Sequence, residues 1–597
     1  MRIVSHGTND WGPDDVARLH ATSQPLSRSL GGSVVRDAGY SLGQSDIADD
    51  RPPEQTFVLS GLGTQFETYD TRTDHVLEKL LRSKRVPCAE RRNLEFLPIN
   101  ELERIMTPEN IYLELLCAGV SSDIQRVTES LCRRGKQSRQ RIFAILCMLR
   151  MAAQIVEFEL EGIYDGDLPF IFRNTTVYRG TNPSSKRSTD VISLFQSSCW
   201  EPVRLESFEK YQGQLTAPIF KFAWAAGEKV LHFPLKDQLV LPFMHVEETS
   251  NNGELGASIQ RQGGTSIVRK VKIHPAHYNA SPETVSGVLK TWIFADEAKV
   301  SKADLCFAVK ELQVLKDSDK PHGADEDREA VTLKRLNEQR DPHLIRLLAT
   351  YTYDSRFHLI FPWADGNLKD LWAMPFHQPS ARLRDAELVR WMSTQILGLA
   401  CALQKIHYCP IDEPNIQGLP SHAQERPHGR HGDLKPENIL WFKDTEDADG
   451  MRSMGMLQIA DFGFADFHTK HSRSKVRRST VSGFTDTYKA PEYDVSQWVS
   501  PRYDIWSFGC ILLQFIVWYL RGWEGVDDFS KARSADSKGA PIEADIFFGL
   551  EVGSARDFKA RAKLSVVKVS ANKLDIATGA DAARLDVRQP ENRHRMQ

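Results

Sequence analysis

The sequence predicts an α+β protein in which a β-rich part precedes a helical part. Two short runs rich in β-branched residues, SIVRKVKI at residues 266–273 and LCFAVKEL at residues 305–312, have the pattern of strands. After them, apolar residues recur on one face of a helix that runs from Leu388 to about His407. Strands first and helices afterwards favour a two-layer or two-lobed α+β unit.

The region before these strands is expected to be of two kinds. Residues 1–55 are rich in Ser, Gly, Asp and Arg without regular apolar spacing, which is typical of a disordered tail. Residues 56–250 form a mixed, mainly helical accessory region whose function the sequence does not reveal. Within it, residues 141–163 predict one largely buried helix. A polar, glycine-containing run at residues 247–256 predicts a linker, so we expect the α+β domain at residues 251–597.

The composition excludes a strong electrostatic field of one sign over the whole surface. The 597 residues carry 76 Lys and Arg against 79 Asp and Glu, a formal charge of −3, which gives no support for a nucleic-acid or membrane partner. The start of the chain lacks a basic segment followed by an apolar run, and the nine cysteines have no metal-ligand spacing, so we expect an intracellular protein. The apolar run from Cys510 to Leu520 is about half the ~20 residues that cross a bilayer and predicts a buried helix.

The most informative motifs lie in the second half of the chain. HGDLKPENIL begins at His431, DFG at Asp461 and APE at Ala490. Upstream, Lys310 ends the strand sequence FAVK, and Glu329 begins a run with helical spacing. In order and in wording these motifs resemble those of the eukaryotic protein kinases of the serine/threonine type. The wider pattern, with its long insertions, resembles kinase-like proteins of filamentous fungi.

The resemblance implies a bilobal protein-kinase fold, with a small β-rich N-lobe at residues 251–364 and a helical C-lobe at residues 365–597. It implies an enzyme that transfers the γ-phosphoryl group of ATP, with Mg²⁺, to a serine or threonine hydroxyl of a protein substrate. Positioning and electrostatics dominate such a reaction. Lys310 would hold the α- and β-phosphates, and Glu329 would hold Lys310 in place.

The resemblance also assigns the residues of the catalytic loop. Asp433 would accept the proton of the attacking hydroxyl, and Lys435 would lie near the γ-phosphate. Asn438 and Asp461 would be the oxygen ligands of Mg²⁺. The remaining assignments are substrate positioning by Thr485 and structural roles for His431, Phe462, Glu492, Asp504 and Arg593, of which Arg593 would form an ion pair with Glu492.

The nucleotide pocket departs from the family pattern. The sequence RQGGTSIV, residues 261–268, keeps only Gly263 of the three glycines of the phosphate-covering loop, with Gly264 beside it. Because glycines let backbone N–H groups approach phosphates closely, we expect a stiffer cover and weaker ATP binding. Adenine would lie under Val268 and Ala308. It would contact the backbone at two further residues, Phe361 and Trp363.

Two further departures bear on activity and regulation. Gly432 stands where the family has an arginine that pairs with a phosphate on the activation segment, which predicts activity independent of that phosphorylation. Residues 521–586 are polar where the family has further helices, which predicts a shortened helical lobe. A pseudokinase that serves as a nucleotide-binding scaffold is therefore the alternative. A third interpretation makes the N-terminal region the functional core and the kinase part its regulator.

Overall fold

All of the described residues fall between Tyr69 and Gln597. A computed structural model describes the protein at residues 75–91, 93–120, 123–174, 176–180, 191–225, 227–246, 260–262, 266–279, 305–312, 326–374, 386–409, 428–443, 454–463, 465–468, 476–477, 486–496, 498–537, 544–552 and 558–574. The tail predicted at residues 1–55 lies outside the described residues.

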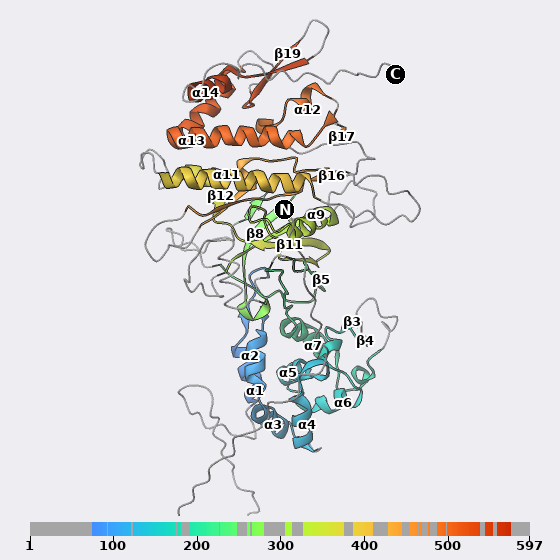
Figure 1. Ribbon diagram of the computed structural model, residues 1–597. Coiled ribbons are helices and arrows are strands. Elements are labelled where there is room, and N and C mark those ends of the chain that lie inside the picture. Colours follow the sequence, from blue (N-terminus) through green and yellow to red (C-terminus); the bar gives the residue numbers. More distant parts are fainter. Residues whose placement is uncertain are drawn as a thin grey trace, which may run out of the picture. The chain divides into compact units, whose positions relative to one another are not determined.

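The described residues of the accessory region contain the helices α1 to α7 together with short strands (Figure 1). A cluster of buried aliphatic and aromatic side chains, with Phe143, Phe158 and Phe208 fully buried, holds its helices together. Two short hairpins, β1 with β2 and β3 with β4, complete it. Its elements are α1 (Val76–Ser83), β1 (Val86–Pro87), β2 (Glu95–Phe96), α2 (Ile99–Ile105), α3 (Pro108–Cys117), α4 (Ile124–Leu131), α5 (Gln140–Met148), α6 (Ile155–Leu160), β3 (Ile171–Arg173), β4 (Thr176–Tyr178) and α7 (Pro202–Leu215).

The single helix predicted over residues 141–163 is wrong. The structure ends α5 at Met148 and starts α6 only at Ile155. Arg150, between them, has a φ of 58°, a left-handed conformation that no α-helix continues through. Helix α5 is buried from Ile142 to Met148, whereas α6 buries only Ile155 and Phe158, and its Leu160 is 76% exposed. The apolar content therefore predicted the burial of the first piece, and the local backbone divided the helix.

A seven-stranded sheet carries the β-rich part. Its order is β5-β10-β11-β9-β8-β6, with β7 also paired to β8. The strands predicted at residues 266–273 and 305–312 are β8 and β9. The members of the sheet are β5 (His232–Pro234), β6 (Phe243–Met244), β7 (Gln260–Gln262), β8 (Ser266–Ile273), β9 (Phe307–Leu312), β10 (Ala349–Tyr353) and β11 (Arg356–Pro362).

The sheet begins earlier than the predicted domain boundary at residue 251. Strand β5 pairs in parallel with β10, and β6 pairs with β8, although both precede the polar run at residues 247–256. Phe220, Phe222 and Phe243 lie fully buried in one cluster with residues of β8, β9 and β10. Strands β5 and β6 and these phenylalanines are thus part of the sheet and its core, although they precede the predicted boundary.

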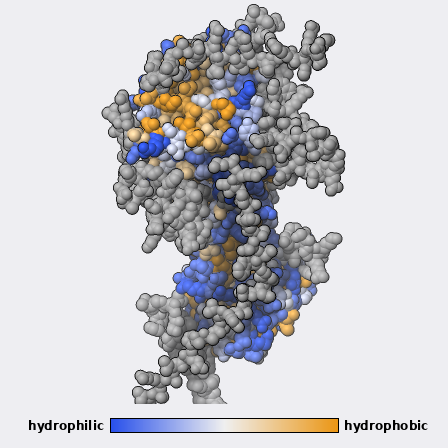
Figure 2. All heavy atoms as spheres, viewed as in Figure 1, coloured by the Kyte–Doolittle hydropathy of each residue, from blue (hydrophilic) through white to orange (hydrophobic). Residues whose placement is uncertain are grey.

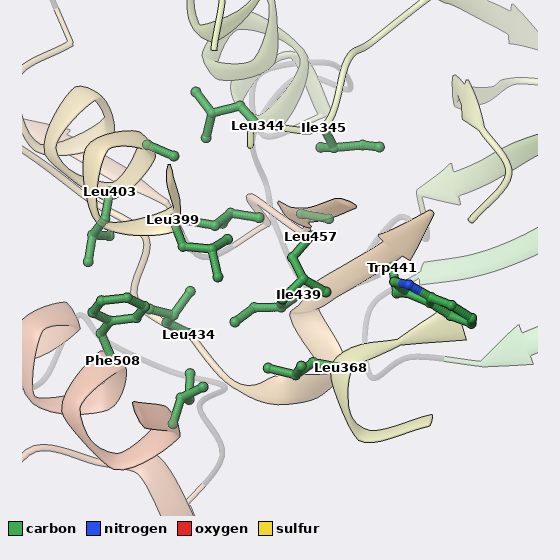
Figure 3. Close-up of a cluster of buried hydrophobic side chains, with 14 of the residues drawn as sticks. Leu344, Ile345, Leu368, Leu399, Leu403, Leu434, Ile439, Trp441, Leu457 and Phe508 are labelled. Atoms are coloured by element: carbon green, nitrogen blue, oxygen red, sulfur yellow. The ribbon is translucent and has the colours of Figure 1, made fainter. Parts of the chain in front are cut away.

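The helical part is built around α11 (Ala386–His407), predicted to its last residue, and α13 (Arg502–Ala535). These two helices lie side by side (Figure 1), with the rings of Trp391 and Phe515 6.0 Å apart. Figure 3 shows the core between α11, α13 and the central strands, where Leu399, Leu434 and Phe508 meet. The other elements are α9 (Glu326–Glu338), β12 (Gly366–Asn367), α10 (Leu368–Ala373), β13 (His428–Arg430), β14 (Ile439–Phe442), β15 (Met456–Ile459), β16 (Asp466–His468), β17 (Val476–Arg477), α12 (Glu492–Val495), β18 (Trp498–Val499), β19 (Phe548–Val552), β20 (Phe558–Ala562) and α14 (Leu564–Leu574).

The polar stretch after Arg521 is more structured than its composition indicates. Helix α13 continues past a kink at Gly522, and the hairpin β19–β20 and α14 follow. By length and composition alone α13 could cross a membrane, but 56% of its most apolar stretch is buried in the protein, as in a core helix. Apolar side chains gather on the surface of this part of the molecule (Figure 2); Ile505, Leu520 and Leu564 are among those exposed.

Candidate active site

The site centres on Lys310, whose side chain is held between two carboxylates. Its Nζ lies 2.7 Å from Glu329 Oε1 on α9 and 2.8 Å from Asp461 Oδ1, in the loop after β15. Lys310 and Glu329 are both 7% exposed. Three segments far apart in the sequence therefore meet at one ammonium group. The contact with Glu329 is the one that the family resemblance implies, and the contact with Asp461 was not predicted.

These contacts fix the charges of the site. Burial alone would lower the pKa of Lys310, but the two carboxylates outweigh it and raise that pKa above its ordinary value. The Lys310 ammonium holds the pKa of Asp461 at about 2. Burial raises the pKa of Glu329, and the ammonium opposes this effect. Lys310 is accordingly a cation and Asp461 an anion at neutral pH.

The backbone of the DFG tripeptide directs Asp461 at Lys310. Asp461 has a φ of 64°, an uncommon conformation for a residue with a side chain and one found at functional sites. The next residue, Phe462, is 1% exposed and packs edge-on against the His431 ring, with centroids 5.1 Å apart. Burial of Phe462 thus holds the Asp461 carboxylate towards Lys310.

The catalytic loop brings three more of the predicted residues together. Lys435 Nζ donates to Asp433 Oδ2 at 2.6 Å. Asn438 Nδ2 donates to the Asp433 carbonyl at 2.8 Å and to its Oδ2 at 3.2 Å. Asp433 and Asn438 are buried, so these bonds fix the orientation of both side chains.

Asp504, at the start of α13, holds the backbone of this loop in place. Its fully buried carboxylate accepts the backbone N–H groups of His431 at 2.8 Å and Gly432 at 2.9 Å. It also lies 2.9 Å from His407 Nε2, a contact that sequence reasoning missed because nothing in the α11 pattern singles out this histidine. Gly432 has a φ of 87°, which glycine adopts without strain.

The predicted residues around the nucleotide share one face of the sheet. Val268 lies directly opposite Lys310, and Ala308 opposite Phe361, so their side chains point to the same side. The predicted backbone contact at Trp363 is wrong, because its N–H donates to the Cys306 carbonyl at 3.2 Å.

Alternation along β11 identifies the backbone groups that adenine could use instead. Since Phe361 and Trp363 direct their N–H and C=O groups at β9, the Pro362 carbonyl and the Ala364 amide are directed away from it. The predicted backbone contact at Phe361 therefore moves to the Pro362 carbonyl, and the one at Trp363 moves to the Ala364 amide. The sequence did not indicate this shift, because it depends on the register of β11 against β9.

Four predicted residues, Gly263, Gly264, Thr485 and Arg593, lie outside the described residues. The ion pair predicted between Arg593 and Glu492 is therefore not visible. Burial raises the pKa of Glu492, and Arg502 and Arg430 oppose this effect, so cations of the described chain lie near it.

Arg430 itself was not predicted as a site residue. It precedes His431, is 6% exposed, and its Nε and Nη1 have no hydrogen-bond partner among the described residues.

The part of the chain that contains the catalytic loop is similar in sequence to known proteins. The family model described as protein kinase domain matches residues 426–531. Cyclin-dependent kinase D-1 of Arabidopsis thaliana is 25% identical over 210 residues, which cover 34% of this chain and 42% of that protein. A probable serine/threonine-protein kinase, KIN28 homolog, of Encephalitozoon cuniculi is 24% identical over 215 residues, 36% of this chain and 54% of its own.

A third relative, serine/threonine-protein kinase ppk15 of Schizosaccharomyces pombe, is 28% identical over 193 residues, 32% of this chain and 29% of its own. The matches span between about a third and about half of the relatives' lengths. The segment that the family model matches contains the catalytic loop, Asp461 and most of α13. Over residues 426–531 the chain therefore matches the protein kinase domain, in agreement with its resemblance to the eukaryotic protein kinases.

Proposed function

We propose that the protein is an ATP-dependent serine/threonine protein kinase that works with Mg²⁺. The observation that carries this proposal is the assembled site: Lys310 bridges Glu329 and Asp461, while Asp433 is oriented by Lys435 and Asn438. These side chains converge on one site, where their two ammonium groups would meet the phosphates of a nucleotide. The two lobes of the proposed kinase fold would be the seven-stranded sheet with α9 and the helical part from α10 onwards.

The residues present fit a magnesium nucleotide. Because Asn438 donates through Nδ2 to Asp433, its Oδ1 is left as a ligand, and Asp461 is ionised. Among the described residues no group of three or more His, Cys, Asp or Glu could hold a metal ion. Mg²⁺ prefers oxygen ligands, so two protein oxygens together with phosphate oxygens and waters would form a suitable site. When bound, the ion would neutralise part of the phosphate charge.

The chain's own residues divide the remaining work. Lys310 binds phosphate oxygens and is held in place by Glu329. The Pro362 carbonyl and the Ala364 amide would bind the adenine edge, under Val268 and Ala308. Asp433 orients the hydroxyl of the protein substrate and accepts its proton, while Lys435 offsets the charge on the transferred group. Lys435, together with Thr485, favours serine and threonine over tyrosine.

The test is phosphate transfer from ATP to a generic basic protein by the wild type and by Asp433→Asn. We expect the variant to lose at least about a hundredfold in kcat, since it loses its proton acceptor, and to keep its affinity for ATP. The matched control is Asp486→Asn, whose carboxylate is exposed at the start of a nearby turn. Equal rates in wild type and Asp433→Asn would contradict the proposal. ATP binding without transfer by the wild type would instead indicate a nucleotide-binding scaffold.

A further inference from the structure

A buried polar cluster lies behind the strand that carries Lys310. Lys310 and Glu311 are neighbours on β9, so their side chains point to opposite faces of the sheet. Glu311 is 5% exposed. Arg269 Nη2 on β8 donates to Glu311 Oε2 at 2.7 Å, and Arg356 Nη1 on β11 donates to Glu311 Oε1. We call these three residues the Glu311 clamp, because one carboxylate of β9 is held from both neighbouring strands.

The accessory region reaches this clamp through Glu90. Glu90 lies in the loop between β1 and β2, and its Oε1 is 3.8 Å from Arg269 Nη1. The neighbouring Ala89 N–H donates to the Phe243 carbonyl on β6 at 2.7 Å, which fixes the loop against the sheet. Arg269 is therefore shared between a carboxylate of the sheet and a carboxylate of the accessory region.

The charges make Glu90 more than a packing contact. Two arginines face the single carboxylate of Glu311, so the clamp alone has an excess positive charge, which an ionised Glu90 offsets. Burial raises the pKa of Glu90, and the Arg269 guanidinium is the main charge that opposes this effect. The contact between them is ionic only, since Glu90 Oε1 makes no hydrogen bond to a described residue. Within the part of the chain that the structure describes, the surroundings supply no substitute. Burial lowers the pKa of His358, opposite Glu311, to about 4, so its ring is neutral, and the Tyr351 hydroxyl has no described hydrogen-bond partner. Removal of the Glu90 charge would free Arg269 to shift, and β9 would move with it.

We propose that Glu90 is a positioning residue through which the accessory region sets the place of β9, and hence of Lys310, in the nucleotide site. This inference rests on the proposed function. A displacement of about 1 Å at a binding group is enough to change its performance greatly. The accessory region would then be a working part of the catalytic unit rather than a separate module.

The test compares Glu90→Gln with the wild type in the full chain. Titration with ATP and Mg²⁺ should show a dissociation constant raised about three- to tenfold, the range of a mutation that acts through a contact network. The kcat at saturating ATP should stay within about twofold, because Asp433 and Lys435 are untouched. Glu90→Asp, which keeps the charge, should restore most of the affinity.

The matched control is Glu95→Gln in the same hairpin. Glu95 pairs with Arg85 inside the accessory region at 2.9 Å and does not touch the clamp, so ATP affinity should not change. A lower melting temperature with unchanged ATP affinity in Glu90→Gln would overturn the inference and leave a structural role only.

A second measurement separates this inference from the proposed function. Without nucleotide, the backbone amides of Val309, Lys310 and Glu311 should exchange hydrogen faster in Glu90→Gln than in wild type or Glu95→Gln. If the wild type binds no ATP, the proposed function fails, and the exchange at β9 still decides whether Glu90 positions the strand. Unchanged exchange there would contradict the inference whatever the activity.

Discussion

Lys310 shows how one side chain can join three distant segments. Its ammonium compensates two carboxylates, one of them on Glu329, which is buried almost completely. The exposed ion pair of Lys369 with Glu437, at 3.0 Å, has similar geometry without the burial. The two pairs therefore differ in what their loss should cost, since water compensates only the exposed one.

We predict that Lys310→Met destabilises the protein by about 3–5 kcal/mol and abolishes ATP binding, because two carboxylates would face each other without a cation. Urea unfolding and ATP titration measure the two effects. The control Lys369→Met should cost less than about 1 kcal/mol and leave ATP binding unchanged. Equal losses in the two variants would show that burial does not set the strength of the Lys310 contact.

At the residue scale, the sequence was sufficient for side chains but not for backbone groups. The structure brings Lys310 to Asp461 and Asn438 to Asp433, while the roles assigned to these four side chains stay predictions. Trp363 was wrong as a backbone contact, because strand register decides where an N–H group points. Register depends on pairing with Cys306, about sixty residues away, which no local pattern reveals.

At the scale of elements, the N-terminus of α13 acts as the support of the catalytic loop. Asp504 accepts two backbone N–H groups of that loop and contacts His407 at the end of α11. Burial alone would raise the pKa of Asp504, but these bonds, with His407 foremost, outweigh burial and lower it. The stabilisation is therefore present above the ordinary pKa of an aspartate and is lost as the pH falls through the lower folded value.

We predict that Asp504→Asn destabilises the protein by at least about 2 kcal/mol, because an amide leaves one of the buried donors without an acceptor. The catalytic loop would lose its support, so kcat should fall more than ATP affinity. Urea unfolding and steady-state kinetics test this. Asp527→Asn, on the exposed side of the same helix, is the control and should change neither quantity.

The elements themselves were predictable to differing degrees. The predicted end of α11 at His407 is correct, because buried residues recur on one face of the helix up to its last turn. The run at residues 141–163 was read as one helix, because apolar residues on every turn mask a break. Only the conformation of Arg150 reveals it.

At the scale of the whole molecule, the accessory region and the sheet are joined by a neutral histidine. His277 is 1% exposed; its Nε2 accepts the Ile99 N–H at 3.1 Å, and its Nδ1 donates to the Pro218 carbonyl at 3.0 Å. Both nitrogens are thus used by the neutral ring. Burial lowers the pKa of His277 to about 4, and His274 and Arg141 nearby act in the same direction.

We predict that stability falls as the pH is lowered from about 6.5 to about 4, because the unfolded chain binds a proton at His277 that the folded chain excludes. The loss from this residue is at most about 3 kcal/mol. Unfolding measured across this range in wild type and His277→Gln tests it, and the variant should have the shallower slope. His245→Gln, at an exposed position, should keep the wild-type slope.

The pairing of β5 with β10 has a practical consequence for shortened versions of this protein. A chain cut at the predicted boundary, residue 251, would lack β5, β6 and the phenylalanines that cover the back of the sheet. Strand β10 would become an open edge with unpaired N–H and C=O groups beside exposed aromatic rings, which is a template for aggregation. A soluble catalytic fragment should therefore begin before Ala217, and insolubility of a shorter one would say nothing about its activity.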